Sequence, residues 1–416
     1  MQGAIKVARY GWPVNEDLIM YMDFAESYAG NFLVDDPSWA IDFAPTGTRV
    51  ALGDIITRKR YADTLETIAN EGPDAFYTGR IAESMINALT AANGTMTLQD
   101  LKDYKAVIRT PSNITYRGFR LHSCSNPSGG EVALAVLKTV EGYDDFFHPG
   151  NVNLSTHRLD EAMRFAYGAR SNLGDPAYVK GMVEFQDDLL SSERAKHIRS
   201  KINDKHTLNI SAYNPSGFEI HENHGTSQVV TADASGMAIT LTTTVNLLFG
   251  SALMVPETGI IMNNEQNDFS IPGYQNEFGY PPSPANYVRP GKRPLSSITP
   301  VIAEWPNGTL YYVIGSAGGS RIITTTIQNL VHVLDRNMTT LEALAQPRMH
   351  DQLIPNLAYF EDAYDNGTVA FMRERGHNVT NLGVGMSSAQ GIRMLPNGTF
   401  EAAGEPRQKN SGGFAV

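Results

Sequence analysis

The sequence predicts a mixed α/β fold in which sheets are sandwiched between helical layers. Apolar residues recur at three- and four-residue steps through most of residues 1 to about 220, as in amphipathic helices. From Thr226 onward, β-branched runs alternate with turn signals, as in antiparallel strands. Helical periodicity then returns near the C-terminus. This order of elements favours one layered structural unit.

Helices are expected in six segments of the first half, at Asn15 to Asn31, Tyr61 to Asn93, Thr97 to Tyr104, Gly130 to Tyr143, Ser155 to Asn172 and Ser191 to Asn203. The third begins with a capping pattern, because the side chain of Thr95 or Thr97 can accept a hydrogen bond from a first-turn amide. One strand pair, around Ile114 to Leu121, interrupts the helices.

Strands are expected in the second half at Ser227 to Ala232, Met237 to Asn246, Gly259 to Asn263, Thr299 to Glu304 and Leu310 to Gly315, with a hairpin turn at Ala234-Ser235-Gly236. Later helices are expected at Arg321 to Asp335 and Thr340 to Ala345, and short strands near Leu357 to Glu361 and Ser387 to Leu395. The segment Phe269 to Leu295 has neither period and is too long for an ordinary connector. It is interpreted either as a functional loop over a site or as a wrapped surface loop.

The composition of the chain excludes several classes of protein. With 416 residues, 42% of them hydrophobic, the chain can bury a large core, so disorder is excluded. A net charge of −11 argues against nucleic acid and anionic membranes as partners and favours small solutes or proteins. The single cysteine, Cys124, forbids an internal disulfide. No His/Cys cluster has zinc-ligand spacing, so no metal is expected.

Targeting features of the sequence point in two directions. No apolar stretch reaches the ~18–20 residues of a membrane helix and the N-terminus lacks a signal-peptide h-region, so the chain as written is expected to be soluble. Nine N-x-S/T sequons are present, at Asn93, Asn113, Asn153, Asn209, Asn307, Asn337, Asn366, Asn378 and Asn397. They are interpreted either as turns or as glycosylated loops of a secretory-pathway protein. The second interpretation predicts an incomplete start of the chain.

A Gly-Thr bond lies directly before a predicted strand, within His224-Gly225-Thr226-Ser227. Threonine is a weak nucleophile unless a base adjoins it, and an N-terminal threonine carries such a base in its own α-amine. That arrangement requires self-cleavage between Gly225 and Thr226, where glycine tolerates the distorted backbone of a scission. The alternative is an ordinary Gly-Thr pair before a strand, which is common.

Two further stretches have residue types suited to binding charged groups. Gly315-Ser316-Ala317-Gly318-Gly319-Ser320-Arg321 joins a strand to a helix, where backbone amides can face an oxyanion or phosphate; without a P-loop ending, nucleotide binding is disfavoured. The segment Asn263 to Asp268 could hold an ammonium group, and Ser296-Ser297 a carboxylate, so together they would recognise an α-amino acid. The alternatives are a tight turn for the first stretch and capped turns for the others.

These stretches, in this order, resemble the γ-glutamyltransferase family, also called γ-glutamyl transpeptidase or glutathione hydrolase, and its fungal members most closely. The matching text runs from Ala4-Ile5-Lys6-Val7-Ala8 through Pro127-Ser128-Gly129-Gly130 to HGTSQVVTADASGMAITLTTTVNLLFG, NNEQNDFS, PLSSITP and GSAGGSRIITT. The resemblance implies a four-layer αββα sandwich of the N-terminal-nucleophile hydrolase type. It also implies cleavage into a large chain, 1–225, and a small chain, 226–416, that remain together as a heterodimer.

The resemblance implies a role for each of several residues. Thr226 is the expected nucleophile, and Thr244, 18 positions later, is the threonine that hydrogen-bonds it. The remaining expected site residues are Gly318 and Gly319 for the oxyanion hole, Asn246, Glu265 and Asp268 for the donor α-amine, Ser296 and Ser297 for its α-carboxylate, and Phe269 to Tyr280 as the lid. The expected donor is glutathione or another γ-glutamyl compound, and the acceptor is water, an amino acid or a dipeptide. No cofactor, metal or nucleic acid is expected.

The sequence departs from the family pattern in three ways. The family's Gly-rich N-terminal segment, with core strands and an arginine that clamps the donor carboxylate, has no counterpart, which predicts a truncated fold with weaker donor binding. Gln228 stands where the family usually has His, and Gln266 replaces Met. Three hypotheses follow: an active γ-glutamyl hydrolase or transferase, a catalytically degenerate truncated paralogue, or an N-terminal-nucleophile amidase with another acyl group. Sequons and family suggest a secreted, cell-surface or vacuolar location.

Overall fold

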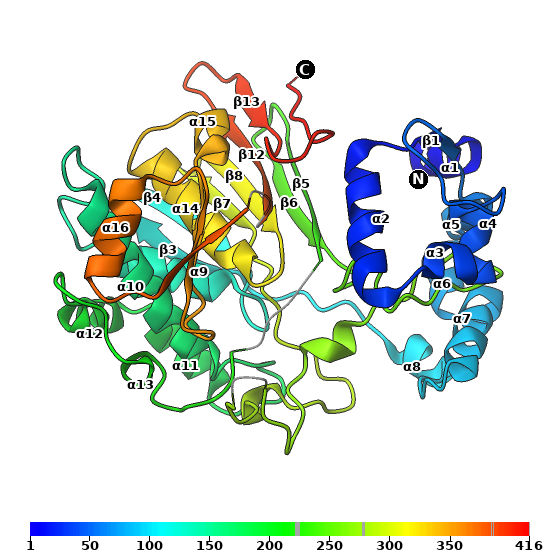
Figure 1. The fold of residues 1–416 in the computed structure, drawn as a ribbon, viewed down its shortest axis with the longest axis horizontal. Helices are drawn as coiled ribbons and strands as arrows, with labels where there is room; N and C mark the ends of the chain where they lie inside the picture. Colours follow the sequence, from blue (N-terminus) through cyan, green and yellow to red (C-terminus); the bar gives the residue numbers. More distant parts are fainter. Residues whose placement is uncertain (221–224, 277–278, 384, 386, 416) are drawn as a thin grey trace. The chain divides into compact units, whose positions relative to one another are not determined.

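A computed structural model of the protein describes residues 1–220, 225–276, 279–383, 385 and 387–415 (Figure 1). The contacts group the chain into two compact units, where the sequence predicts one. The smaller unit comprises Met1–Ile108 and Val245–Asn264, and the larger comprises Arg109–Thr244 and Glu265–Val416. The expected division into chains 1–225 and 226–416 concerns a covalent cleavage rather than packing, and it stays a prediction.

The smaller unit consists mainly of helices: α1 (Gln2–Tyr10), α2 (Glu16–Ala29), α3 (Phe32–Asp35), α4 (Pro37–Phe43), α5 (Lys59–Glu71), α6 (Asp74–Tyr77), α7 (Gly79–Ala91) and α8 (Leu98–Asp103). Strand β1 (Trp12–Pro13) pairs antiparallel with β2 (Ile55–Ile56). The buried Trp39 ring contacts Phe32 and Phe249 at centroid distances of 5.0 and 5.6 Å, and its indole N–H donates to the carbonyl of Ala252 at 2.9 Å. This aromatic cluster ties residues 245–264 to the first helices.

Two predictions for this unit are corrected by the structure. The segment Tyr61 to Asn93 is three helices rather than one, because Gly72 adopts a φ of 89° and Pro73 follows it without an N–H group. The segment Gly259 to Asn263 is not a strand and holds only an isolated bridge between Met254 and Ile261. The predicted cap at Thr97 is confirmed as a capping box with Asp100.

A six-stranded antiparallel sheet forms the centre of the larger unit, in the order β13-β12-β8-β7-β4-β3. Its strands are β3 (Ser112–Tyr116), β4 (Phe119–Ser123), β7 (Val301–Glu304), β8 (Leu310–Ala317), β12 (Ser388–Met394) and β13 (Phe400–Ala403). Consecutive residues Tyr312, Val313 and Ile314 of β8 are all fully buried. Since neighbouring side chains of a strand point to opposite faces, the sheet is covered on both sides at β8.

Helices cover one face of this sheet and a β-hairpin covers part of the other (Figure 1). On the helical face, α9 (Gly130–Val140) and α14 (Arg321–Leu334) pack on the strands, and α10 (Val152–Arg170) packs on α9. The hairpin is formed by β5 (Ser227–Ala232) and β6 (Ala238–Thr243), which pack on β8. The larger unit is therefore layered, with strands between helices and hairpin.

The rest of the larger unit surrounds this core. It contains α11 (Met182–Leu189), α12 (Ser192–Lys201), α13 (Ile210–Tyr213), α15 (Thr340–Ala345) and α16 (Asn366–Glu374), the 3₁₀ turns η1 (Glu265–Asp268) and η2 (Pro284–Asn286), and a second sheet of β9 (Met349–His350), β10 (Ala358–Glu361) and β11 (Val379–Leu382). Among the described residues, no helix is both long and apolar enough to cross a lipid bilayer.

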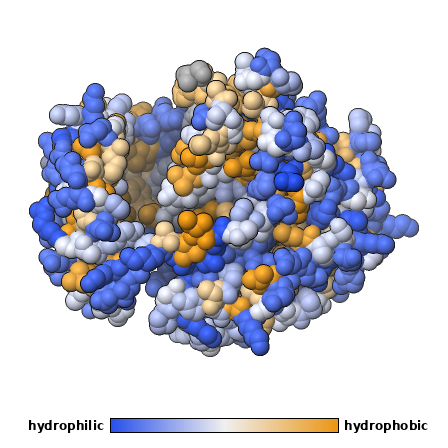
Figure 2. Space-filling model, turned by 180° about the vertical axis from the view of Figure 1, so that it is seen from behind, coloured by the Kyte–Doolittle hydropathy of each residue, from blue (hydrophilic) through white to orange (hydrophobic). Residues whose placement is uncertain are grey.

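Hydrophobic side chains also reach the surface, interspersed with hydrophilic ones (Figure 2). On the outer face of the β5–β6 hairpin, Val229, Ile239 and Leu241 are each about half exposed. Of the sequon residues, Asn307 and Asn397 accept the backbone amides of Thr309 and Thr399 at 3.0 and 3.1 Å, which confirms the turn interpretation at these two positions. Glycosylation stays a prediction.

Candidate active site

The carbonyl group of Gly225 is the centre of a small hydroxyl cluster. The Thr226 hydroxyl donates to the Gly225 oxygen at 2.5 Å, and the Thr244 hydroxyl donates to the same oxygen at 2.6 Å. Gly225 adopts a φ of 67°, a backbone conformation that glycine accepts without strain. Two hydroxyl donors on one carbonyl oxygen draw electron density from its carbon. His224, which precedes this group, lies outside the described residues.

The hairpin register explains why two threonines that are distant in sequence meet here. Strands β5 and β6 are antiparallel, with Ser227 opposite Thr243 at the open end of the hairpin. One residue further along, Thr226 and Thr244 reach the same carbonyl. The structure therefore brings the predicted pair together through an ordinary antiparallel ladder.

Gln228 occupies the face of the hairpin that packs against the central sheet. Its side-chain amide donates to the Thr240 hydroxyl at 2.8 Å, and its carbonyl oxygen accepts from Thr242. It lies directly over Gly315 of β8, where a Cβ would come within 2.2 Å of the Gln228 side chain. A residue that cannot titrate is thus fully hydrogen-bonded between the two layers.

An acidic pair lies in the 3₁₀ turn η1, immediately after the boundary with the smaller unit. Asp268 is buried and Glu265 is partly buried. Burial, the charge of Asp268 and a hydrogen bond with Asp268 raise the pKa of Glu265 to about 7, while hydrogen bonding with Thr244 opposes the rise. Thr244 therefore connects the acidic pair to the Gly225 carbonyl.

The loop before α9 is hydrogen-bonded to the segment that contains Ser296 and Ser297, the predicted carboxylate-binding residues. The Ser296 amide donates to the Pro127 carbonyl at 2.7 Å, and the Gly129 amide donates to the Ile298 carbonyl at 2.9 Å. A Cβ at Gly129 would lie 2.9 Å from the Ser297 carbonyl oxygen, so only glycine allows the two loops to approach this closely. This contact explains why glycine is found at position 129 of the Pro127-Ser128-Gly129-Gly130 segment.

The end of α10 organises the site through two residues that the sequence prediction missed. The Arg170 guanidinium donates to the Ser297 hydroxyl at 3.0 Å; burial lowers the pKa of Arg170, and the charge of Asp268 opposes this effect. One turn earlier, the Tyr167 hydroxyl donates to the Ser320 carbonyl at 2.6 Å. A basic residue in the last turn of a helix is too common a pattern to have indicated the role of Arg170.

The predicted glycine pair lies in the turn between β8 and α14. Gly318 and Gly319 have φ values of 130° and 64°, which favour glycine at both positions. Their carbonyls accept from the amides of Arg321 and Ile322 at 3.3 and 3.1 Å and start α14. The turn interpretation of this stretch is confirmed, and the oxyanion-hole role stays a prediction.

Two other predicted parts of the site are Asn246 and the expected lid. Asn246 belongs to the smaller unit, where it is buried with a φ of 70° and donates to the Asn264 carbonyl at 3.1 Å. Its role in donor binding stays a prediction. Of the expected lid, Phe269 to Tyr280, residues 277 and 278 lie outside the described residues. Ile271 and Tyr274 are exposed, at 61% and 72%.

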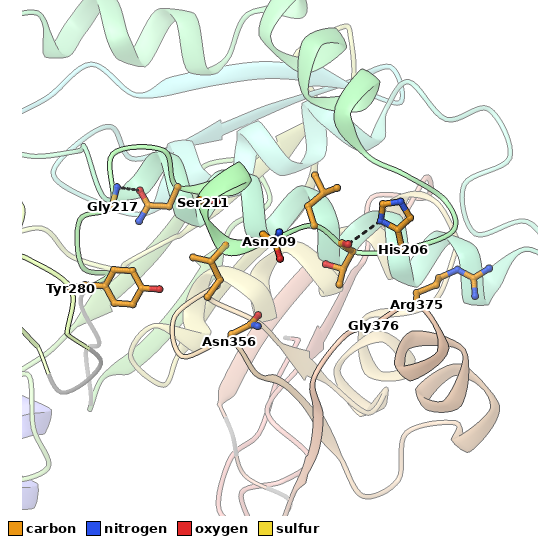
Figure 3. Close-up of a pocket in the computed structure, with 12 residues that line it drawn as sticks. His206, Asn209, Ser211, Gly217, Tyr280, Asn356, Arg375 and Gly376 are labelled. Atoms are coloured by element: carbon orange, nitrogen blue, oxygen red, sulfur yellow. Dashed lines mark hydrogen bonds between the residues drawn. The ribbon is translucent and has the colours of Figure 1, made fainter.

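A pocket of about 710 Å³ lies elsewhere on the larger unit (Figure 3). It is lined by residues 206–211, Asn214, Gly217, Tyr280, Asn356, Arg375 and Gly376. Of the site residues expected from the family resemblance, this lining includes Tyr280, at the end of the expected lid; it also includes Asn209, one of the sequon residues. The pocket is therefore distinct from the hydroxyl cluster at Gly225.

Comparison with known proteins identifies the family of the chain. The family model described as gamma-glutamyltranspeptidase matches residues 1–415. The chain belongs to the γ-glutamyltranspeptidase family. Over its whole length it is 54% identical to the glutathione hydrolase proenzyme of Arthroderma benhamiae and 50% identical to the glutathione hydrolase of Aspergillus flavus, covering 71% of each. The predicted family, with its fungal character and its enzyme class, is confirmed.

A solved structure supports the fold of this γ-glutamyltranspeptidase-family chain. The crystal structure of cephalosporin acylase from Bacillus halodurans matches 99% of the chain with a TM-score of 0.82 and 25% sequence identity, and the match covers 73% of that structure's chain. The fold is a mixed helix and sheet arrangement of the N-terminal-nucleophile hydrolase type, as predicted.

Proposed function

We propose that this γ-glutamyltranspeptidase-family chain cleaves the γ-glutamyl bond of glutathione or a glutathione conjugate, with Thr226 as the nucleophile. The observation that carries this proposal is the Gly225 carbonyl oxygen, which accepts hydrogen bonds from the Thr226 hydroxyl at 2.5 Å and the Thr244 hydroxyl at 2.6 Å. The names of the fungal relatives, both glutathione hydrolases, supply the substrate class.

The first step of the proposal is self-cleavage at Gly225-Thr226. The Thr226 oxygen attacks the Gly225 carbonyl carbon, the peptide C–N bond breaks as the hydroxyl proton passes to the departing nitrogen, and the acyl group is left on the oxygen as an ester. Water then hydrolyses the ester, leaving a Gly225 carboxylate and a free Thr226 amine. The Thr244 hydroxyl supports this step, because a donor held on the carbonyl oxygen stabilises the negative charge that develops there. The two resulting chains remain together as a heterodimer.

The second step is γ-glutamyl transfer by the matured threonine. The Thr226 α-amine takes the hydroxyl proton as the oxygen attacks the donor γ-carbonyl carbon. The donor amine leaves with that proton, and a γ-glutamyl ester of Thr226 remains. Water, or the amine of an amino acid or dipeptide, then attacks the ester and releases Thr226. The amides of Gly318 and Gly319 are the proposed donors to the developing oxyanion.

Recognition of the donor uses two groups of opposite charge at one end of the molecule, its α-ammonium and its α-carboxylate. Glu265 and Asp268 form an acidic pair that suits an ammonium group, since a carboxylate accepts charge-assisted hydrogen bonds. Ser296 and Ser297 suit the α-carboxylate, and Arg170, which donates to Ser297 at 3.0 Å, adds positive charge behind them. An α-amino acid end group matches both requirements.

A purified full-length chain tests the proposal directly. We expect a denaturing gel to show two fragments, N-terminal sequencing of the smaller one to begin at Thr226, and a γ-glutamyl anilide to release its aniline faster when glycylglycine is added. A single intact band without aniline release would overturn the proposal. Cleavage at Gly225-Thr226 without aniline release would instead favour a catalytically degenerate paralogue.

A second candidate function is an amidase with another acyl group. It is favoured by the likeness to the cephalosporin acylase from Bacillus halodurans, whose fold extends over 99% of this chain. The two candidates differ in the acidic pair, because only an acyl group with an ammonium needs Glu265 and Asp268. Anilides of γ-glutamate and of glutarate, which lacks the ammonium, separate them. Preference for the glutarate compound would support the amidase.

A further inference from the structure

A buried polar cluster lies behind the helical layer of the larger unit, away from the hydroxyl cluster at Gly225. We name it the α10 cluster, and it consists of His157, Asp160, Glu161 and Arg164 of α10 together with Asp351, after β9, and His377, before β11. All six side chains are at most 3% exposed. The four from α10 are spaced by three and four residues, so they share one face of the helix.

The hydrogen bonds of the two histidines determine which ring nitrogens carry protons. The His157 Nε2 lies 2.8 Å from the Asn203 carbonyl oxygen, which can only accept, so the proton is on this nitrogen. In a neutral His157 the Nδ1 is then an acceptor, and it lies 2.8 Å from the Nε2 of His377. His377 therefore donates from Nε2 and presents a bare lone pair at Nδ1.

This nitrogen lies close to a carboxylate for which no hydrogen-bond donor is found among the described residues. The His377 Nδ1 lies 3.0 Å from the Asp160 Oδ2. Neither carboxylate oxygen of Asp160 nor the Nδ1 of His377 has a hydrogen-bond partner among the described residues. Two lone pairs this close repel unless a positively charged species lies between them. A buried polar group without a partner is also rare in folded proteins.

The charges of the α10 cluster point in the same direction. Asp160, Glu161 and Asp351 supply three carboxylates, whereas Arg164 supplies one guanidinium, bonded to Asp351 at 2.6 Å. With neutral histidines the formal charge is therefore −2. Isolated buried charge of this size is costly, and buried carboxylates are ordinarily paired or bound to a metal. A divalent cation would balance the cluster.

We propose that His377 Nδ1, Asp160 and Asp351 form a binding site for one divalent transition-metal ion of the Zn²⁺ class. The nitrogen and carboxylate oxygens of these three residues all lie within 4.8 Å of one another. Two ligands of one zinc ion lie about 3.4 Å apart in tetrahedral geometry with bonds of about 2.1 Å, and His377 Nδ1 and Asp160 Oδ2 are 3.0 Å apart. One nitrogen and two oxygens suit zinc better than magnesium or calcium.

The surroundings of His377 have the form of a metal-site support. A metal-bound histidine almost always donates its other ring N–H to an acceptor, which fixes the ring and its tautomer. Here the relay from His377 Nε2 to His157 Nδ1, and from His157 Nε2 to Asn203, performs this task. Arg164 holds the Asp351 carboxylate, and the Leu353 amide donates to its other oxygen at 2.6 Å. His157 is thus a positioning residue.

The pocket of about 710 Å³ (Figure 3) is lined by residues that neighbour the α10 cluster in the chain or in its hydrogen-bond network. Its lining includes Gly376, the chain neighbour of His377, and Asn356, which accepts from Arg164 at 2.7 Å. Thr207, another lining residue, lies 2.9 Å from the Tyr213 hydroxyl, which donates to Glu161. Polar side chains therefore connect the pocket to the α10 cluster.

Metal analysis of the full chain tests the proposal. The protein is stripped with a chelator, incubated with Zn²⁺ alone, desalted and measured by inductively coupled plasma mass spectrometry. We expect about one equivalent of zinc in the wild type and in H197Q, which changes an exposed histidine of α12 and controls for surface binding. Asp160→Asn and His377→Gln should lose the ion, and His157→Gln should weaken it about 10- to 100-fold.

Cobalt provides a readout that does not depend on a folded variant. Co²⁺ added to the stripped wild type should give visible absorption bands of a nitrogen and oxygen site, and one equivalent of Zn²⁺ should remove them. A wild type that binds no more zinc than a metal-free blank, or an Asp160→Asn chain that retains wild-type affinity, would overturn the proposal. In that case a proton shared by Asp160 and His377 is what satisfies the pair.

Discussion

Two acidic clusters of the larger unit share a chemistry but differ in exposure. At Glu265 and Asp268, burial and mutual repulsion raise the pKa of Glu265 to about 7, yet the side chain is partly exposed and hydrogen-bonds with Thr244. In the α10 cluster, burial alone raises the pKa of Asp160 to about 7, and Arg164 opposes the rise. The negative charge of the first cluster is accessible to a cationic solute. The negative charge of the second cluster is buried, so a proton or a bound cation within the fold has to balance it.

A carboxylate with a raised pKa is interpreted from its exposure and its neighbours. A raised pKa by itself marks both clusters, because desolvation acts on any buried acid. Exposure and the neighbouring groups separate them: the first borders the Gly225 carbonyl through Thr244, and the second borders a histidine lone pair. Substrate binding is the proposed use of the first cluster and ion binding that of the second.

The largest effect is expected at the hydroxyl next to the first cluster. Thr226→Ala removes the proposed nucleophile, so the chain should stay a single band and aniline release should fall by at least about 10³-fold. Ser227→Ala, at the exposed neighbouring residue, is the matched control and should cleave and turn over normally. A Thr226→Ala chain that still cleaves would show that another residue is the nucleophile.

The next largest effect should come from breaking the second cluster. Arg164→Met leaves the buried Asp351 carboxylate without the guanidinium that bonds it, so the free energy of unfolding should fall by about 3–5 kcal/mol. Arg194→Met, which removes a surface ion pair with Asp188, should cost about 0–1 kcal/mol. Urea unfolding in the presence of a chelator measures both, and equal losses would show that the buried Arg164 contributes no more to stability than a surface ion pair.

A smaller effect is expected at the link between the acidic pair and the carbonyl. Thr244→Ala removes one donor from the Gly225 oxygen, so self-cleavage should slow by about 10²–10³-fold. Loss of the intact band over time on a denaturing gel measures the rate. Thr243→Ala, whose side chain is exposed on β6, should cleave at the wild-type rate. Self-cleavage of Thr244→Ala at the wild-type rate would show that the Thr244 hydroxyl takes no part in the reaction.

The smallest effect is a pH dependence of donor binding. Because the pKa of Glu265 is raised to about 7, the carboxylate that attracts an ammonium is lost as the pH falls through 7. The KM for a γ-glutamyl anilide should therefore fall about tenfold from roughly pH 6 to pH 8. Glu265→Gln should flatten this profile. A wild-type KM that does not change with pH would show that Glu265 does not bind the donor ammonium.

The same shift has an opposite consequence for stability. A carboxyl group whose folded pKa is raised favours the protonated form in the folded state. The contribution of Glu265 to stability is therefore largest at low pH, and it decreases as the pH rises from its ordinary value of 4.5 toward 7. The folded protein is therefore less stable at the pH where the charged Glu265 carboxylate is needed to bind the donor ammonium.

Local elements of the fold followed from the sequence wherever their signals were local. The capping box at Thr97, the β5–β6 hairpin and helix α14 were predicted, because periodicity and turn chemistry depend on neighbouring residues. The break at Gly72-Pro73 was missed, although both residues oppose a continuous helix. The Gly259 to Asn263 segment has strand-like residues but finds only a single bridge.

The amino-acid sequence was sufficient to predict the family, the Gly-Thr bond before a strand, and the glycine, acidic and serine stretches of the candidate site. The contacts of Arg170 with Ser297 and of His377 with His157 of α10, 220 residues earlier in the chain, became visible only in the folded structure. The physical reason is that local backbone preferences act over a few residues, whereas these contacts arise when distant elements pack together. Sequence spacing excludes a zinc motif, and packing nevertheless assembles nitrogen and carboxylate ligands at one buried point.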